Sequence, residues 1–141
     1  MNEKTLFYPS TGVSVDIIWK YGFNLSICHK TSFGNFSLFI SPKVLILNKY
    51  FLDEFGQGIY FYLNSSYNSY MDFQVNTVNQ VFSCKVLISQ FTVGNSSITA
   101  TTLPKVNNKR VDSTVNTYLN PDLFVVYDET HVFPEYLINF E

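Results

Sequence analysis

The sequence predicts an α+β fold in a single domain of 141 residues. Val81–Phe91 alternates apolar and polar residues, as a half-buried strand does. Asp122–Asp128 holds a near-continuous apolar run that is typical of a buried strand. Val13–Tyr21 places apolar residues at helical spacing. Apolar residues make up 46% and aromatic residues 18% of the chain, which is enough for a globular core and excludes a disordered chain.

The first two elements are a strand and a helix. Thr5–Tyr8 is a short apolar run that ends at Pro9. A polar residue after this proline can cap a helix over about Val13–Tyr21, and Gly22 suits the position just past the helix end. The inward face of this helix is expected to hold Val15, Ile18 and Trp19.

The middle of the chain is harder to assign. A loop rich in Ser, Thr and Gly is expected over Asn24–Gly34. The apolar segment Asn35–Phe55 lies between two similar Phe-Gly ends. A short helix is expected over about Asn64–Tyr70.

The second half reads mainly as strands. Val81–Phe91 is the alternating strand, and Gly94 ends it. Thr99–Thr117 is polar and is expected to be a loop. Leu123–Asp128 and Tyr136–Phe140 are expected to close the sheet, with a turn between them. The predicted inward face of the alternating strand carries Phe82, Cys84, Val86 and Ile88.

Charge and residue usage exclude several function classes. The net charge is -2 and the pI about 5.6, so the basic surface of a nucleic-acid-binding domain is not apparent. Lys105, Lys109 and Arg110 are interpreted as a solvated loop. No apolar run is long enough to span a membrane, and the N-terminus does not read as a secretion signal. A cytoplasmic or nuclear protein without membrane contact is therefore expected.

Cysteine and histidine are too few for a metal site. Cys28 and Cys84 are each interpreted as small buried apolar residues. His29 and His131 are the only histidines, and neither has a second ligand at metal-binding spacing. No metal is expected.

Three motifs in order resemble the catalytic domain of the poly(ADP-ribose) polymerase (PARP) family. They are Gly56–Phe61, Val86–Asn95 and Asn120–Phe140. The last is most similar to the mono-ADP-ribosyltransferase branch, which includes the degenerate domain of the zinc-finger antiviral protein. The resemblance implies a PARP-like ADP-ribosyltransferase fold, a split antiparallel β-sheet with a few short helices. It also implies NAD as co-substrate and a protein acceptor or partner, with RNA reached only through other domains.

The same resemblance makes residues 35–55 an insertion, because the family's Phe-Gly runs directly into Gly-x-Tyr-Phe. The segment is either a hairpin beside the cleft or unspliced sequence. Whether the chain is a fragment of a larger protein stays open.

The resemblance assigns three catalytic positions. Tyr8 stands where the family has a histidine that contacts the adenosine ribose. Tyr60 stands where a tyrosine stacks on nicotinamide. Leu123 stands where polymer-forming members have a glutamate. Since mono-transferring members also carry an aliphatic residue there, Leu123 argues against polymer elongation but not against a single transfer.

It also assigns an NAD pocket, which is degenerate here. Pro9 replaces a glycine whose backbone holds the nicotinamide carboxamide, and proline has no N–H to donate. Asn68 replaces a serine that contacts the same group. Met71 stands where a second stacking tyrosine belongs, although a slip of one residue would put Tyr70 there.

Three functions are consistent with these positions. The favoured one is a degenerate PARP-like domain that acts as an interaction module without NAD turnover. The alternative is an active NAD-dependent protein mono-ADP-ribosyltransferase with an unusual pocket. A third is a non-catalytic binder of NAD, ADP-ribose or RNA ends.

Overall fold

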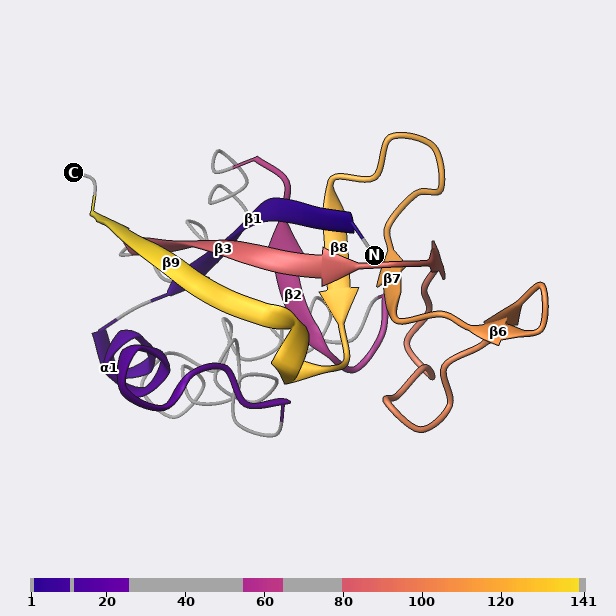
Figure 1. Ribbon diagram of the computed structural model, residues 1–141, viewed down its shortest axis with the longest axis horizontal. Coiled ribbons are helices and arrows are strands. Elements are labelled where there is room, and N and C mark those ends of the chain that lie inside the picture. The colour runs from indigo at the N-terminus through magenta and orange to yellow at the C-terminus, as the bar shows by residue number, and fades with distance from the viewer. Residues whose placement is uncertain (1, 11, 26–54, 65–79, 140–141) are drawn as a thin grey trace, which may run out of the picture.

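The computed structural model of the chain describes residues 2–10, 12–25, 55–64 and 80–139. Its elements are shown in Figure 1. In chain order they are β1 (Asn2–Ser10), α1 (Gly12–Tyr21), β2 (Ile59–Tyr62), β3 (Gln80–Ile88), β4 (Phe91–Val93), β5 (Lys105–Val106), β6 (Lys109–Arg110), β7 (Ser113–Val115), β8 (Leu123–Val126), the short 3₁₀ helix η2 (Glu129–His131) and β9 (Val132–Asn139).

The main sheet has seven strands in the order β4-β7-β8-β2-β1-β3-β9. All its neighbouring strands are antiparallel except β4 and β7, which run parallel. The two halves of the sheet meet between β1 and β2, where only Phe7 and Tyr62 are paired. Figure 1 shows β1, β3 and β9 crossing β2 and β8 at a wide angle. The predicted α+β fold with a split sheet is confirmed, and the parallel β4–β7 pair is an addition to it.

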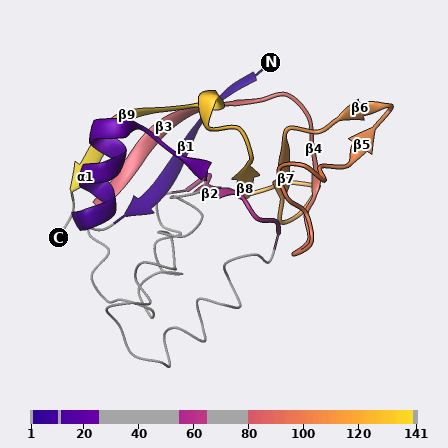
Figure 2. The ribbon, with the colours of Figure 1, turned by 90° about the horizontal axis from the view of Figure 1, so that it is seen from below.

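The helix α1 covers one face of the β1–β3–β9 half of the sheet (Figure 2). Val15 and Ile18 are buried as predicted, but Trp19 is 57% exposed. Its ring packs against Phe82 at a centroid distance of 5.7 Å, so it lies over the margin of the core. Gly22 has φ +80° and its N–H donates to the Ile18 carbonyl at 2.8 Å, which confirms the predicted helix end.

The alternating strand is confirmed up to Ile88, and Cys84 in it is buried as predicted. The prediction that it continues to Phe91 is wrong. The chain breaks at Ser89 and Gln90, whose N–H groups donate to the Asp112 carboxylate at 2.7 and 3.3 Å. Phe91 then starts β4, which pairs with β7. The Asp112 carboxylate thus accepts from two backbone N–H groups that would bond to a neighbouring strand if β3 continued.

The predicted loop over Thr99–Thr117 contains three strands. β5 and β6 form a separate hairpin, turned by Asn107 and Asn108 with positive φ of 53° and 65°, as a type I′ turn requires. β7 is part of the main sheet, with Ser113, Thr114 and Val115 buried. Its polar residues led to the prediction of a loop. The Thr114 hydroxyl can be buried because it forms hydrogen bonds with groups that are distant in the sequence.

The last strand also begins earlier than predicted. A 3₁₀ turn at Glu129–His131 follows β8, and β9 already starts at Val132. Pro134 therefore lies inside the strand, which tolerates it because β9 is at the edge of the sheet.

Several predicted features lie outside the described residues: most of the loop 24–34, the insertion 35–55 except Phe55, the helix 64–70 beyond Asn64, Cys28 and His29. No helix within the described part of the chain is long and apolar enough to cross a bilayer.

Candidate functional site

The paired strands β2 and β8 separate two clusters of buried side chains. Ile59 and Phe61 of β2 belong with Phe124 and Val126 of β8 to the cluster that also contains Val15 and Ile18 of α1. The residues between them form a second cluster on the opposite face, because successive side chains of a strand alternate. The second cluster contains Tyr60, Tyr62, Ile98, Leu123, Val125 and Tyr127.

Tyr8 lies in the first cluster. Its side chain is 2% exposed and its ring meets Phe23 edge-on at 5.1 Å and Phe61 at 5.6 Å. It therefore lies on the opposite face of the sheet from Tyr60 and Leu123. The three positions that the family uses as one catalytic set are not brought together.

Tyr60 and Leu123 do share a face. Leu123 pairs with Tyr62, and Tyr60 pairs with Val125, on the neighbouring strands β2 and β8. Diagonal neighbours of this kind lie about 7–8 Å apart. Both side chains are buried within the second cluster, so the Leu123 side chain offers only apolar contact there.

The Tyr60 hydroxyl forms two hydrogen bonds with the backbone just before β2. It accepts a hydrogen bond from the Phe55 N–H at 3.0 Å and donates one to the Gly56 carbonyl at 2.9 Å. This hydroxyl is therefore used to hold the start of the Gly-x-Gly-x-Tyr-Phe motif. Its retention in the sequence has a structural cause that needs no ligand.

Removing this hydroxyl is expected to loosen the segment. In Tyr60→Phe the Phe55 N–H loses its acceptor and the Gly56 carbonyl loses its donor. We expect a loss of about 1–3 kcal/mol in the free energy of unfolding, measured by urea denaturation, with faster hydrogen exchange at the Phe55 amide. Tyr118→Phe is the matched control, since Tyr118 is 64% exposed. Equal effects of the two changes would contradict the assigned role.

Thr114 and Ile98, which the sequence did not single out, hold the same segment in place. The Thr114 hydroxyl donates to the Phe55 carbonyl at 2.8 Å and lies 2.8 Å from the Tyr127 hydroxyl. The Gln57 N–H donates to the Ile98 carbonyl at 2.8 Å. Asp112-Ser113, just before Thr114, resembles a recurrent element in a later loop of PARP catalytic domains, and this resemblance is the one sequence signal near β7.

The glycines of the motif are required by close packing. Gly56 has φ +139°, and a Cβ atom on it would lie 1.7 Å from the Tyr127 hydroxyl oxygen. A Cβ on Gly58 would lie 2.7 Å from the Val126 carbonyl oxygen. The glycines of the motif that carries the family resemblance thus allow the chain at the start of β2 to pack closely against Val126 and Tyr127.

Pro9 lies in β1 opposite Val81 of β3. Since β1 pairs with β2 only at Phe7, the missing N–H of Pro9 removes no hydrogen bond to β2. The other predicted pocket residues, Asn68, Tyr70 and Met71, lie outside the described residues.

Two cavities lined by described residues lie at the far end of β8 from Leu123. One, of about 280 Å³, is lined by residues that include Arg110, Tyr127 and His131. The other, of about 340 Å³, is lined by residues that include Leu25, Tyr127 and Glu129. Neither includes a residue at which the family places catalysis.

Asp128 and His131 between these cavities form a local turn. The Thr130 hydroxyl, which donates to the Asp128 carboxylate at 2.5 Å, lowers the pKa of Asp128 below its ordinary value. The His131 Nε2 atom lies 3.5 Å from the same carboxylate. No group of three potential metal ligands occurs in the described parts of the chain.

Comparison with known proteins gives relatives along nearly the whole chain. No family model matches. The chain is 25% identical to human protein mono-ADP-ribosyltransferase PARP12, 28% identical to human PARP14 and 27% identical to human PARP11, over 143, 145 and 145 aligned positions. Each alignment covers 99% of this chain, but only 17%, 7% and 42% of the respective relative.

These relatives support a PARP-like domain. All three are named mono-ADP-ribosyltransferases, which agrees with the branch predicted from Asn120–Phe140. The chain spans less than half the length of each, so the similarity concerns one region of larger proteins. The closer resemblance to the degenerate domain of the antiviral protein stays a prediction.

Proposed function

We propose that this PARP-like domain is degenerate and acts as a folded interaction module that does not turn over NAD. The observation that carries the proposal is the division of the catalytic positions between the two faces of the sheet. Tyr8 packs under α1 with Phe23 and Phe61, whereas Tyr60 and Leu123 lie in the second cluster. A set of groups must converge within about an ångström of its productive geometry to act on one substrate.

The described residues do not fit NAD in the manner that the resemblance implies. Tyr8 is enclosed by aromatic rings on the face away from Tyr60. Pro9 has no N–H for the nicotinamide carboxamide. A carboxamide oxygen left unpaired in a buried pocket costs about 1–3 kcal/mol, or roughly 5- to 150-fold in affinity.

An active mono-ADP-ribosyltransferase is the second candidate. Its support is the adjacency of Tyr60 and Leu123 on one face and the names of the relatives. Under this hypothesis Tyr60 would offer its ring to nicotinamide, and the chain would transfer one ADP-ribose unit to a protein.

NAD binding and self-modification separate the two candidates. We expect no saturable heat of binding when NAD is titrated into the chain up to millimolar concentration, and no radiolabel transferred from NAD to the protein. Saturable binding together with self-labelling would establish the second candidate, provided that Tyr60→Ala remains folded by circular dichroism and abolishes the labelling.

Two single variants test the reason for inactivity. Pro9→Gly restores a backbone N–H and is expected to raise NAD affinity by about 5- to 150-fold. Tyr8→His is expected to give no gain and to lower stability, because the imidazole would replace a ring packed against Phe23 and Phe61. A gain from Tyr8→His alone would show that this position does face the ligand.

A further inference from the structure

The β5–β6 hairpin concentrates positive charge on an acidic chain. Residues 73–111 contain four basic residues and no aspartate or glutamate, whereas the whole chain has a net charge of -2. Three of the four, Lys105, Lys109 and Arg110, lie on the hairpin and are exposed. Figure 1 and Figure 2 show the hairpin projecting from the body of the molecule at the end far from α1.

The register of the hairpin sets like charges opposite each other. Lys105 pairs with Arg110, and Val106 pairs with Lys109. Directly opposite side chains share a face and lie about 4.5–5.5 Å apart at Cβ, where two like charges are unfavourable. No carboxylate in the described part of the chain forms an ion pair with these cations. A local rule broken without an internal compensation is typical of a functional site, and a bound anion would relieve the repulsion.

The hairpin is held in place by hydrogen bonds to the chain around it. The side-chain amide of Gln90 donates to the Val106 carbonyl at 3.2 Å. At the base of the hairpin, the Val111 N–H donates to the Pro104 carbonyl at 3.0 Å, and Val111 itself is buried. Arg110 therefore projects from a fixed backbone, which lowers the entropic cost of binding a ligand.

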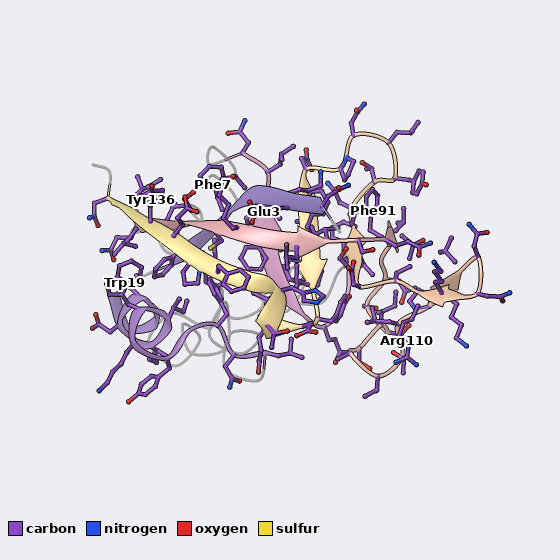
Figure 3. All side chains as sticks on the ribbon, viewed as in Figure 1. Glu3, Phe7, Trp19, Phe91, Arg110 and Tyr136 are labelled. Atoms are coloured by element: carbon purple, nitrogen blue, oxygen red, sulfur yellow. The ribbon has the colours of Figure 1, made fainter. Side chains whose placement is uncertain are left out.

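Arg110, the only arginine of the chain, borders a cavity of about 280 Å³. Ala100, Leu103 and Val111 contribute apolar side chains to the wall of this cavity. Figure 3 shows Arg110 at the opposite end of the molecule from Trp19 on α1. Sites for small molecules usually have volumes of about 300–1,000 Å³, so a cavity of this size suits a single side chain better than a cofactor.

The two carboxylates in the cavity wall are occupied by other donors. Asp112 accepts from the two backbone N–H groups that follow β3. Asp128 accepts from the N–H and the hydroxyl of Thr130, and His131 Nε2 lies 3.5 Å from it. The guanidinium of Arg110 is thus the charged group of the wall that is left for a ligand. Its planar fork matches a carboxylate through two parallel N–H···O bonds.

We propose that the basic hairpin binds a short acidic segment of a partner protein, with one carboxylate paired to the Arg110 guanidinium at the cavity. Lys105, directly opposite Arg110, binds a second carboxylate of the segment. A nucleic acid fits less well, because the positive surface spans only two residue pairs. Asp112 and Asp128 beside it would also repel a long polyanion.

This site shares no residue with the family's catalytic positions. The binding itself is therefore independent of NAD turnover, and only the role of the partner rests on the proposed function as an interaction module. A chain that binds the acidic segment and also turns over NAD would contradict the proposed function alone. A chain that does neither would contradict this inference alone.

Binding of a capped tetraglutamate peptide, followed by NMR, tests the proposal. Arg110 gives the only arginine Nε–H signal of the chain, so its contact with the peptide can be observed directly. We expect this signal and the amides of the hairpin to shift saturably below about 1 mM peptide at low salt. A tetraglutamine peptide, which carries no charge, should cause no shift. Absence of saturation up to about 10 mM tetraglutamate would overturn the proposal.

Variants separate the role of Arg110 from a general effect of charge. Arg110→Gln should weaken binding about tenfold and Arg110→Lys about threefold, since an ammonium group cannot form the two parallel bonds. Lys105→Gln should weaken it about two- to fivefold. Lys20→Gln, the matched control, removes the same charge from an exposed site on α1 and should leave binding unchanged. Equal effects of Lys20→Gln and Arg110→Gln, or a short single-stranded RNA that binds at Arg110 more tightly than the peptide, would overturn the proposal.

Discussion

Gly56→Ala is expected to destabilise the domain by about 3–5 kcal/mol, from the combined cost of a strained φ and of overpacking. The new Cβ would lie 1.7 Å from the Tyr127 hydroxyl, and φ at this position is +139°. Tyr127 cannot simply move aside, because its hydroxyl is held 2.8 Å from that of Thr114 within the core. Urea denaturation with tryptophan fluorescence measures the loss.

Gly22→Ala is the matched control for this change. Gly22 also has a positive φ, of +80°, but nothing lies within 4 Å of a Cβ atom built on it. Gly22→Ala should lower the free energy of unfolding by only about 1 kcal/mol. The double variant Gly56→Ala with Tyr127→Phe removes the colliding oxygen, so it should cost less than the sum of the single changes. Equal losses for the two glycines would mean that the contact with Tyr127 is not tight.

Phe61→Ala is expected to cost about 3–5 kcal/mol, as buried phenylalanines generally do. Phe61 is fully buried and its ring lies 5.6 Å from Tyr8 and 5.4 Å from Phe23. It joins β1, β2 and the segment after α1 across the junction where the two halves of the sheet share a single residue pair. The loss would be a large part of the 5–15 kcal/mol that stabilises a typical domain.

Phe133→Ala deletes the same side chain from an exposed site. Phe133 is 53% exposed on β9, so its removal should cost about 1 kcal/mol or less. Thermal unfolding of both variants gives the comparison. If Phe61→Ala proved as mild as Phe133→Ala, the cluster under α1 would not be the part that holds the two halves together.

The elements that the sequence predicted well are those with a strong local signal. The apolar run of β8, the alternation of β3 and the glycine after α1 were all placed close to their observed positions. The failures have non-local causes. β7 is buried although its residues Ser113 and Thr114 are polar, and the alternating strand breaks because Asp112 binds the N–H groups of Ser89 and Gln90.

The sequence by itself determined the residue types at the family's catalytic positions and the resemblance to the PARP family. It also determined which residues of one strand share a face, since side chains alternate along any strand. Only the tertiary structure decided how the faces of different strands coincide. That depends on the register between strands, which long-range pairing and packing establish. For this reason Tyr8 lies on the other face of the sheet from Tyr60 and Leu123.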